Sequence, residues 1–409
     1  MTEFQSDAFD ARVFELYLSA YFSASGFAVD RTHARPDFVI ERDGLRAAVE
    51  ATTTNPSQGG VLGRTAARIE DLDTPSEITE YCDGELAVRL SNALHEKMRK
   101  QYWNLDHVRD APFVIAIETF HDPHALQLSD TALTQYLYGL RAEAEMTDRG
   151  ELLVGSSAIA THQKATKVVR SGFFDQPETE RVSAVLFTNA GTVAKFSRMG
   201  YLAGVGGRDV HILRRGTAYD PDPDAMLPRF FQYDLDAAPH RETWGEGLVC
   251  VHNPNALHPL PDKYFPDAVD SRLEDRQVIS NYQGWHPVAS ITNVVHDRWR
   301  QKPRPMTKAV EIRSIPKQMF HEFVAVVPGA GALFHEEVWL EEASGAFLGL
   351  IVRARQDGDY GFAVFAPDQD RIFHPIENRF NFPTRPQAAM GVWNHITRLL
   401  SGRQRVFRR

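Results

Sequence analysis

Two acidic residues, Asp37 and Glu50, are placed where they could act together on a metal ion. Asp37 begins the apolar run Phe38-Val39-Ile40, and Glu50 lies within the run from Leu45 to Thr52. The dipeptide Asp43-Gly44 between the runs is a two-residue turn signal, so the segment predicts a β-hairpin with the two carboxylates side by side. Mg²⁺ and Mn²⁺ bind such hard oxygen ligands, and a metal held there could promote hydrolysis of a phosphodiester. The alternative is that both residues are ordinary hairpin charges.

Hydrolysis of a phosphodiester also benefits from a cation near the attacking water, and Lys97 is the candidate. Residues 85–102 predict a helix whose apolar stripe is made by Leu86, Leu90, Ala93 and Leu94. Lys97 lies in the middle of that stripe, and Lys100 lies on its edge. A lysine on a core-facing stripe must reach solvent or pair with an anion. Because this helix would pack on the sheet, Glu50 and Lys97 could each supply the charge that the other needs.

The elements around this hairpin predict an α/β domain with a mixed sheet. Residues 8–24 predict an amphipathic helix, and Glu15 lies on the flank of its apolar face, where its carboxylate could equally remain in water. Phe113 to Glu118 is a continuous apolar run typical of a central buried strand. A helix is expected over 128–146 and a further buried strand over 182–187. The order of helix, three strands, helix, strand, helix and strand indicates layered α/β architecture.

These residues together resemble the PD-(D/E)XK nuclease superfamily. The resemblance rests on Glu15 in the first helix, on Pro36-Asp37 in a strand and on Glu50-Ala51-Thr52 in the next strand, and it covers residues 8–120, extending toward 190. It implies a restriction-endonuclease-like αβββαβ core. By this resemblance, Asp37 and Glu50 bind Mg²⁺ or Mn²⁺, Glu15 assists them, and the protein is an endonuclease that cuts DNA, in the setting of bacterial defence against foreign DNA.

The chain departs from the superfamily pattern at one informative position. Thr52 stands where the superfamily has a lysine, two residues after Glu50. One interpretation is that the lysine function has moved to the following helix, which implicates Lys97. The other interpretation is that the site is inactive and that the nuclease fold survives as a nucleic-acid-binding or protein-binding module. Both interpretations remain open on the sequence.

The remainder of the chain suggests additional parts. We expect a nuclease core over 1–200, a turn-rich extension packed on it over 201–297, a basic linker over 298–318, and a smaller C-terminal α+β module over 319–409. The module is expected to recognise a target, a protein partner or a second copy of the chain. The candidates for phosphate contact or base stacking are Lys100, Arg298, Trp299, Arg300 and Lys302. The alternative is that these residues form an ordinary solvated surface.

The composition of the 409 residues limits the class of protein. The formal net charge of −9 argues against a chain coated in positive charge, but it allows a local basic groove. Two cysteines far apart, with no signal peptide and no apolar run long enough for a bilayer, predict a cytoplasmic protein without membrane attachment. His252 and His258 do not have the spacing of a known zinc site.

Overall fold

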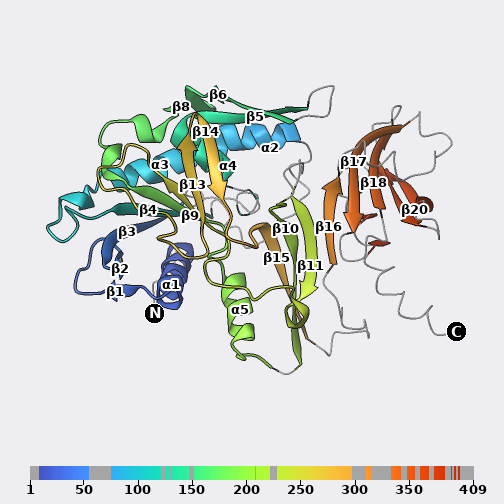
Figure 1. Cartoon of the computed structure of the whole chain (residues 1–409), viewed down its shortest axis with the longest axis horizontal. Coiled ribbons are helices and arrows are strands. Elements are labelled where there is room, and N and C mark those ends of the chain that lie inside the picture. Colours follow the sequence, from blue (N-terminus) through green and yellow to red (C-terminus); the bar gives the residue numbers. More distant parts are fainter. Residues whose placement is uncertain are drawn as a thin grey trace. The chain divides into compact units, whose positions relative to one another are not determined.

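A computed structural model of the chain describes residues 9–54, 75–120, 126, 128, 130–146, 152–207, 209–221, 228–296, 310–315, 333–341, 348–354, 360–367, 373–382, 388, 391–392 and 395–396. The chain divides into two compact units. The first includes the N-terminal residues, Ser76–Ala203 and Glu242–Ala289, and the second includes Gly204–Arg241 and Ser290–Arg409. Each unit is built around an eight-stranded sheet (Figure 1). Among the described residues, no helix has both the length and the apolar character needed to cross a membrane.

The sheet of the first unit is mixed, with the strand order β1-β2-β3-β4-β9-β12-β13-β14. Strands β1, β2 and β3 are antiparallel neighbours, whereas β3, β4 and β9 run parallel. Strand β12 is antiparallel to β9 and parallel to β13, and β14 closes the edge antiparallel to β13. The bounds are β1 Ala28–Asp30, β2 Phe38–Arg42, β3 Leu45–Thr54, β4 Phe113–Thr119, β9 Ala184–Thr188, β12 Leu248–His252, β13 Val269–Glu274 and β14 Gln277–Asn281. This is the α/β class that the sequence predicts.

Helices cover both faces of this sheet (Figure 1). Helix α1 (Phe9–Ala24) packs on the face that carries Ala47, Val49 and Ala51 of β3, where aromatic side chains of the helix fill the core. Helices α3 (Ala87–Met98) and α4 (Thr131–Tyr138) pack on the opposite face, which carries Ala48. Because side chains alternate along a strand, Glu50 shares its face with Ala48 and points to the α3 side.

Shorter elements complete the first unit. Helix α2 (Pro75–Tyr81) leads through the π-helical turn η3 (Cys82–Leu86) into α3. Helix α5 (Val193–Leu202) follows β9. The hairpin of β7 and β8 spans Thr161–Lys164 and Lys167–Arg170. The one-turn 3-10 helices are Tyr102–Asn104, Phe173–Asp175 and Thr179–Arg181.

The expectation of one helix over 128–146 is wrong in its second half. Helix α4 ends at Tyr138 because Gly139 adopts a left-handed conformation with a φ of 67°, as is common after a helix. The chain then forms β5 (Leu140–Met146), which pairs antiparallel with β6 (Leu152–Ala158). Strand β5 contains alanines and glutamates, which favour helices, so cross-strand pairing here overrides local propensity.

The second unit has the strand order β15-β10-β11-β16-β17-β18-β19-β20. Its buried side chains include Phe231, Tyr233, Ile351 and Phe362. The bounds are β10 Val210–Ala218, β11 Arg229–Asp234, β15 Pro287–His296, β16 Val310–Ile315, β17 Leu333–Glu341, β18 Leu348–Ala354, β19 Tyr360–Pro367 and β20 Phe373–Phe382, with a 3-10 turn at Leu235–Ala237.

Two predicted segment assignments differ from this arrangement. Val310–Ile315, inside the segment 298–318 expected to be a linker, is strand β16, which pairs with both β11 and β17. The expected extension over 201–297 contributes β10, β11 and β15 to the second sheet, but β12, β13 and β14 to the first. The expected strand 320–327 lies outside the described residues. The expected helix 387–400 is described only at Ala388, Gly391–Val392 and His395–Ile396, which are helical.

Candidate metal and catalytic site

The β2–β3 hairpin brings Asp37 and Glu50 together. Phe38 is paired with Val49 in this antiparallel hairpin, so Asp37 lies opposite Glu50. The Ala51 N–H donates to Asp37 Oδ2 at 2.8 Å, and the Asp37 N–H donates to Glu50 Oε2 at 3.2 Å. Glu50 is 4% exposed, whereas Asp37 is exposed to solvent. The pair therefore combines a fixed buried carboxylate with one that a ligand can reach.

Lys97 completes this group from helix α3. Its Nζ donates to Glu50 Oε1 at 2.7 Å, and the lysine side chain is 20% exposed. The last turn of α3 crosses the face of the sheet to which Glu50 points, so the helical phase and the strand alternation bring the two charges together. The sequence predicted this contact, and the structure shows it. The catalytic role of the three residues stays a prediction.

The surroundings of Glu50 disfavour its charged form. Burial is the largest cause that raises the Glu50 pKa, and the negative charge of Asp37 raises it further. Lys97 and the Asp37 N–H act in the opposite direction without cancelling that rise. A cation bound between the two carboxylates would stabilise the charged form.

Aromatic and basic residues surround this group. Burial raises the Tyr102 pKa and the Glu50 charge raises it further, while Arg35 and Lys97 lower it. His107 Nε2 is 2.8 Å from the carbonyl oxygen of Arg35, and the rings of His107 and His33 stack 3.7 Å apart. Tyr102, Arg35, His107 and His33 were not among the site residues predicted from the sequence. The available signal was the position of Arg35 directly before Pro36-Asp37.

Glu15 is not brought to the carboxylate pair. Its Oε2 lies 2.6 Å from Arg12 Nη1 on the same helix. Helix α1 packs on the sheet face that carries Val49, whereas Glu50 points to the other face. Helical periodicity showed that Glu15 flanks the buried side of α1, but it could not show which face of the sheet α1 covers.

The remaining candidates for nucleic-acid contact are only partly described. Lys100 is exposed just beyond the end of α3. The others, Arg298, Trp299, Arg300 and Lys302, lie outside the described residues.

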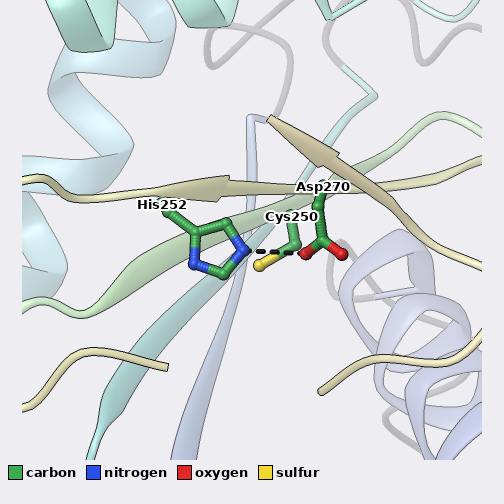
Figure 2. Close-up of side chains that lie close together, drawn as sticks. All are labelled: Cys250, His252 and Asp270. Atoms are coloured by element: carbon green, nitrogen blue, oxygen red, sulfur yellow. Dashed lines mark hydrogen bonds and ion pairs between the residues drawn. The ribbon is translucent and has the colours of Figure 1, made fainter. Parts of the chain in front are cut away.

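Another group of side chains that could hold a metal lies on β12 and β13. Cys250, His252 and Asp270 are all buried, and one ligand atom from each lies within 4.8 Å of the other two. His252 Nε2 is 2.8 Å from Asp270 Oδ1 (Figure 2). Burial raises the pKa of the Cys250 thiol, and the Asp270 charge raises it further. These three residues could hold a metal.

His252 was paired with His258 on the sequence alone, whereas its neighbours in the structure are Cys250 and Asp270. The carbonyl oxygen of His258 accepts a hydrogen bond from Ser183 Oγ, and His258 is not part of the group. The alternation Cys250-Val251-His252 places both side chains on one strand face, which was an available signal. A further group in the second unit, which contains His211, Asp234 and Asp236, is more exposed.

Comparisons of the chain with protein-family models, curated proteins and solved structures gave no match.

Proposed function

We propose that the protein is a metal-dependent endonuclease that hydrolyses DNA phosphodiester bonds. The observation that carries the proposal is the contact of 2.7 Å between Lys97 Nζ and Glu50 Oε1, beside Asp37. An acid on each of two paired strands and a lysine beside them form the set that this chemistry requires. The order α1-β1-β2-β3-α3-β4, with β3 parallel to β4, also fits a restriction-endonuclease-like core.

The donor atoms of Asp37 and Glu50 fit Mg²⁺ or Mn²⁺. Both residues offer carboxylate oxygens, which are the ligands these ions prefer. Burial and the charge of Asp37 raise the Glu50 pKa although Lys97 lowers it, and a bound cation would stabilise the charged carboxylate. When bound, the ion would polarise the phosphoryl group and offset charge that develops on it.

The side chains have distinct roles in this proposal. Lys97 fixes the orientation of Glu50, and its remaining N–H groups can position the attacking water and stabilise the developing negative charge. Asp37 is exposed and faces the substrate side. Arg35, which is exposed beside it, can bind a phosphate group of the DNA. Glu15 is given no role in this proposal, because α1 packs on the other face of the sheet.

The test is a cleavage assay on single-stranded and double-stranded DNA and on RNA, with Mg²⁺, with Mn²⁺ or with EDTA. We expect Glu50→Gln and Lys97→Met each to reduce DNA cleavage by about 100-fold or more, as loss of a charge-stabilising group does. Glu15→Gln is the matched control and should retain wild-type activity. Metal-dependent cleavage that persists in Glu50→Gln would refute the assignment of the site.

One observation favours a second candidate function. Thr52 stands where the superfamily pattern has a lysine, and Lys97 forms an ion pair with Glu50. A nuclease-fold module that binds nucleic acid or protein without cutting it is the corresponding alternative. It predicts binding of an oligonucleotide or a protein partner, with no cleavage under any metal condition.

A further inference from the structure

We propose that Cys250, His252 and Asp270 form a buried zinc site that is separate from the Asp37–Glu50 site. This proposal does not depend on nuclease activity. It concerns a different pair of strands and a different class of ligand atoms.

The strand geometry directs the three side chains to one point. Cys250 and His252 are two residues apart on β12, so they share a face of the sheet. Strand β13 runs parallel to β12, with Asp270 in register with Cys250. Figure 2 shows the sulfur, the imidazole edge and the carboxylate pointing toward one another. The convergence is therefore set by the backbone of two central strands, which makes the positions of the ligands reproducible.

The separations suit a zinc ion. One donor atom of each residue lies within 4.8 Å of the other two. In a tetrahedral site, zinc bonds of roughly 2.0 to 2.3 Å to nitrogen, oxygen and sulfur place two donors about 3.3 to 3.8 Å apart, so side-chain shifts of about 1 Å complete the site. A ligand set of sulfur, imidazole nitrogen and carboxylate oxygen favours zinc over magnesium. Three protein ligands leave a fourth position for a water molecule.

The protons and charges of the proposed site balance. The Cys250 thiol releases its proton to solvent and binds as thiolate. The proton that His252 Nε2 now donates to Asp270 Oδ1 must be released, with the neutral ring then carrying its proton on Nδ1, so that Nε2 is free for the metal. Thiolate and carboxylate together neutralise the double positive charge of zinc. The zinc ion takes the place of the present hydrogen bond between His252 and Asp270.

Neighbouring groups orient these ligands. The Lys263 N–H donates to Asp270 Oδ2 at 2.9 Å, which leaves Oδ1 directed at His252. Arg272 Nη2 lies 3.5 Å from His252 Nε2, and its positive charge is paired with Asp262. The hydrogen bond from Lys263 holds Asp270 in position before the ion binds, whereas Arg272 must turn away from Nε2 when zinc binds there. Cys250 is 1% exposed, so the proposed site is shielded from solvent.

Zinc content and cobalt spectroscopy of the full-length protein test the proposal. The protein is stripped with a chelator and is then titrated with Zn²⁺ or Co²⁺. We expect one zinc ion per chain, a higher melting temperature with zinc, and a thiolate-to-cobalt absorption band. Cys250→Ser should lose the band, and Cys250→Ser and His252→Gln should each bind zinc about 100-fold or more weakly. The matched control Cys82→Ser changes the other cysteine and should behave as wild type.

The wild-type protein alone can overturn the proposal, so the result does not depend on how the variants fold. Absence of a thiolate-to-cobalt band in wild type, or its persistence in Cys250→Ser, would show that Cys250 is not a ligand. Glu50→Gln separates this site from the proposed nuclease site, because it should lose DNA cleavage and keep its zinc. Failure of the nuclease proposal would leave the zinc measurement unaffected.

Discussion

At the scale of single residues, Glu50 and Lys97 show why their contact was predictable. Each lies on the buried side of its element, and each carries a charge that is costly to bury alone. Side chains alternate along β3 and repeat with helical periodicity along α3. Both patterns are local, so the sequence was enough to predict the directions of the Glu50 and Lys97 side chains. Arg35 and Tyr102 could not be found in the same way, because their approach to Glu50 depends on the path of irregular segments.

Glu118 shows a different effect of burial on a carboxyl group. It lies on β4 with 0% exposure. Burial is the main reason that its pKa lies well above its ordinary value of 4.5, and the charge of Asp10 on α1 adds to it, while the Gly191 N–H acts in the opposite direction. Tyr17 of α1 also lies close enough for the Glu118 charge to raise its pKa. The folded state therefore binds the Glu118 proton more tightly than the unfolded state does.

This difference predicts a pH dependence of stability. The stabilising contribution is complete below pH 4.5 and is lost as pH rises toward the higher folded-state pKa. Over that interval the free energy of unfolding should fall by about 1.4 kcal/mol per pH unit from this group. Glu118→Gln should remove this contribution, which urea unfolding at a series of pH values will measure. An identical pH dependence in wild type and variant would contradict the prediction.

At the scale of elements, Gly139 decides where helix becomes strand. It separates α4 from β5 with a φ of 67°, and a Cβ atom there would lie 3.1 Å from the backbone of Gly172. Local propensity could not predict this boundary, because β5 is rich in residues that favour helices. The β2–β3 hairpin, α3 and β4 were predictable, because their apolar periodicity and turn signals agree with their tertiary positions.

Gly139→Ala should lower the free energy of unfolding by about 1 to 2 kcal/mol or more, because alanine is strained at positive φ and would also meet Gly172. Chemical denaturation followed by circular dichroism will measure it. Gly155→Ala is the matched control, since its added Cβ would meet nothing within 4 Å and its φ is not positive. A loss of stability in Gly155→Ala as large as in Gly139→Ala would show that the conformation of Gly139 is not the cause.

At the scale of the whole molecule, the features that the sequence did not predict are those that depend on pairing between strands far apart in the chain. Strand β11 pairs with β16, which lies far along the chain, so the sequence patterns did not place the borders of the two units. The group of Cys250, His252 and Asp270 was missed for a related reason. Its formation depends on the register of two parallel strands joined by a long connection, which no local pattern encodes.

The net charge of −9 is also a property of the whole molecule. A negative protein attracts DNA only where cations are concentrated, so the basic residues beside the proposed nuclease site should dominate the salt dependence of binding. We expect Arg35→Gln to reduce the slope of log affinity against log salt by about one unit, through loss of one phosphate contact. Fluorescence anisotropy of a labelled duplex in EDTA measures binding without cleavage.

Arg276→Gln provides the comparison, since Arg276 is exposed between β13 and β14 at the other edge of the sheet. It should bind DNA with the wild-type slope. Equal slopes for wild type and Arg35→Gln would show that Arg35 does not contact phosphate.

The position of Lys97 on a helix, and not on the strand of Glu50, has a consequence during protein synthesis. The β2–β3 hairpin ends at Thr54 and carries both carboxylates, whereas Lys97 emerges from the ribosome 47 residues after Glu50. A nascent chain that has folded only this hairpin holds the acidic pair without its cation. The complete group of charges therefore forms late, when α3 docks on the sheet, and any activity that depends on it starts only in a chain whose two layers have already assembled.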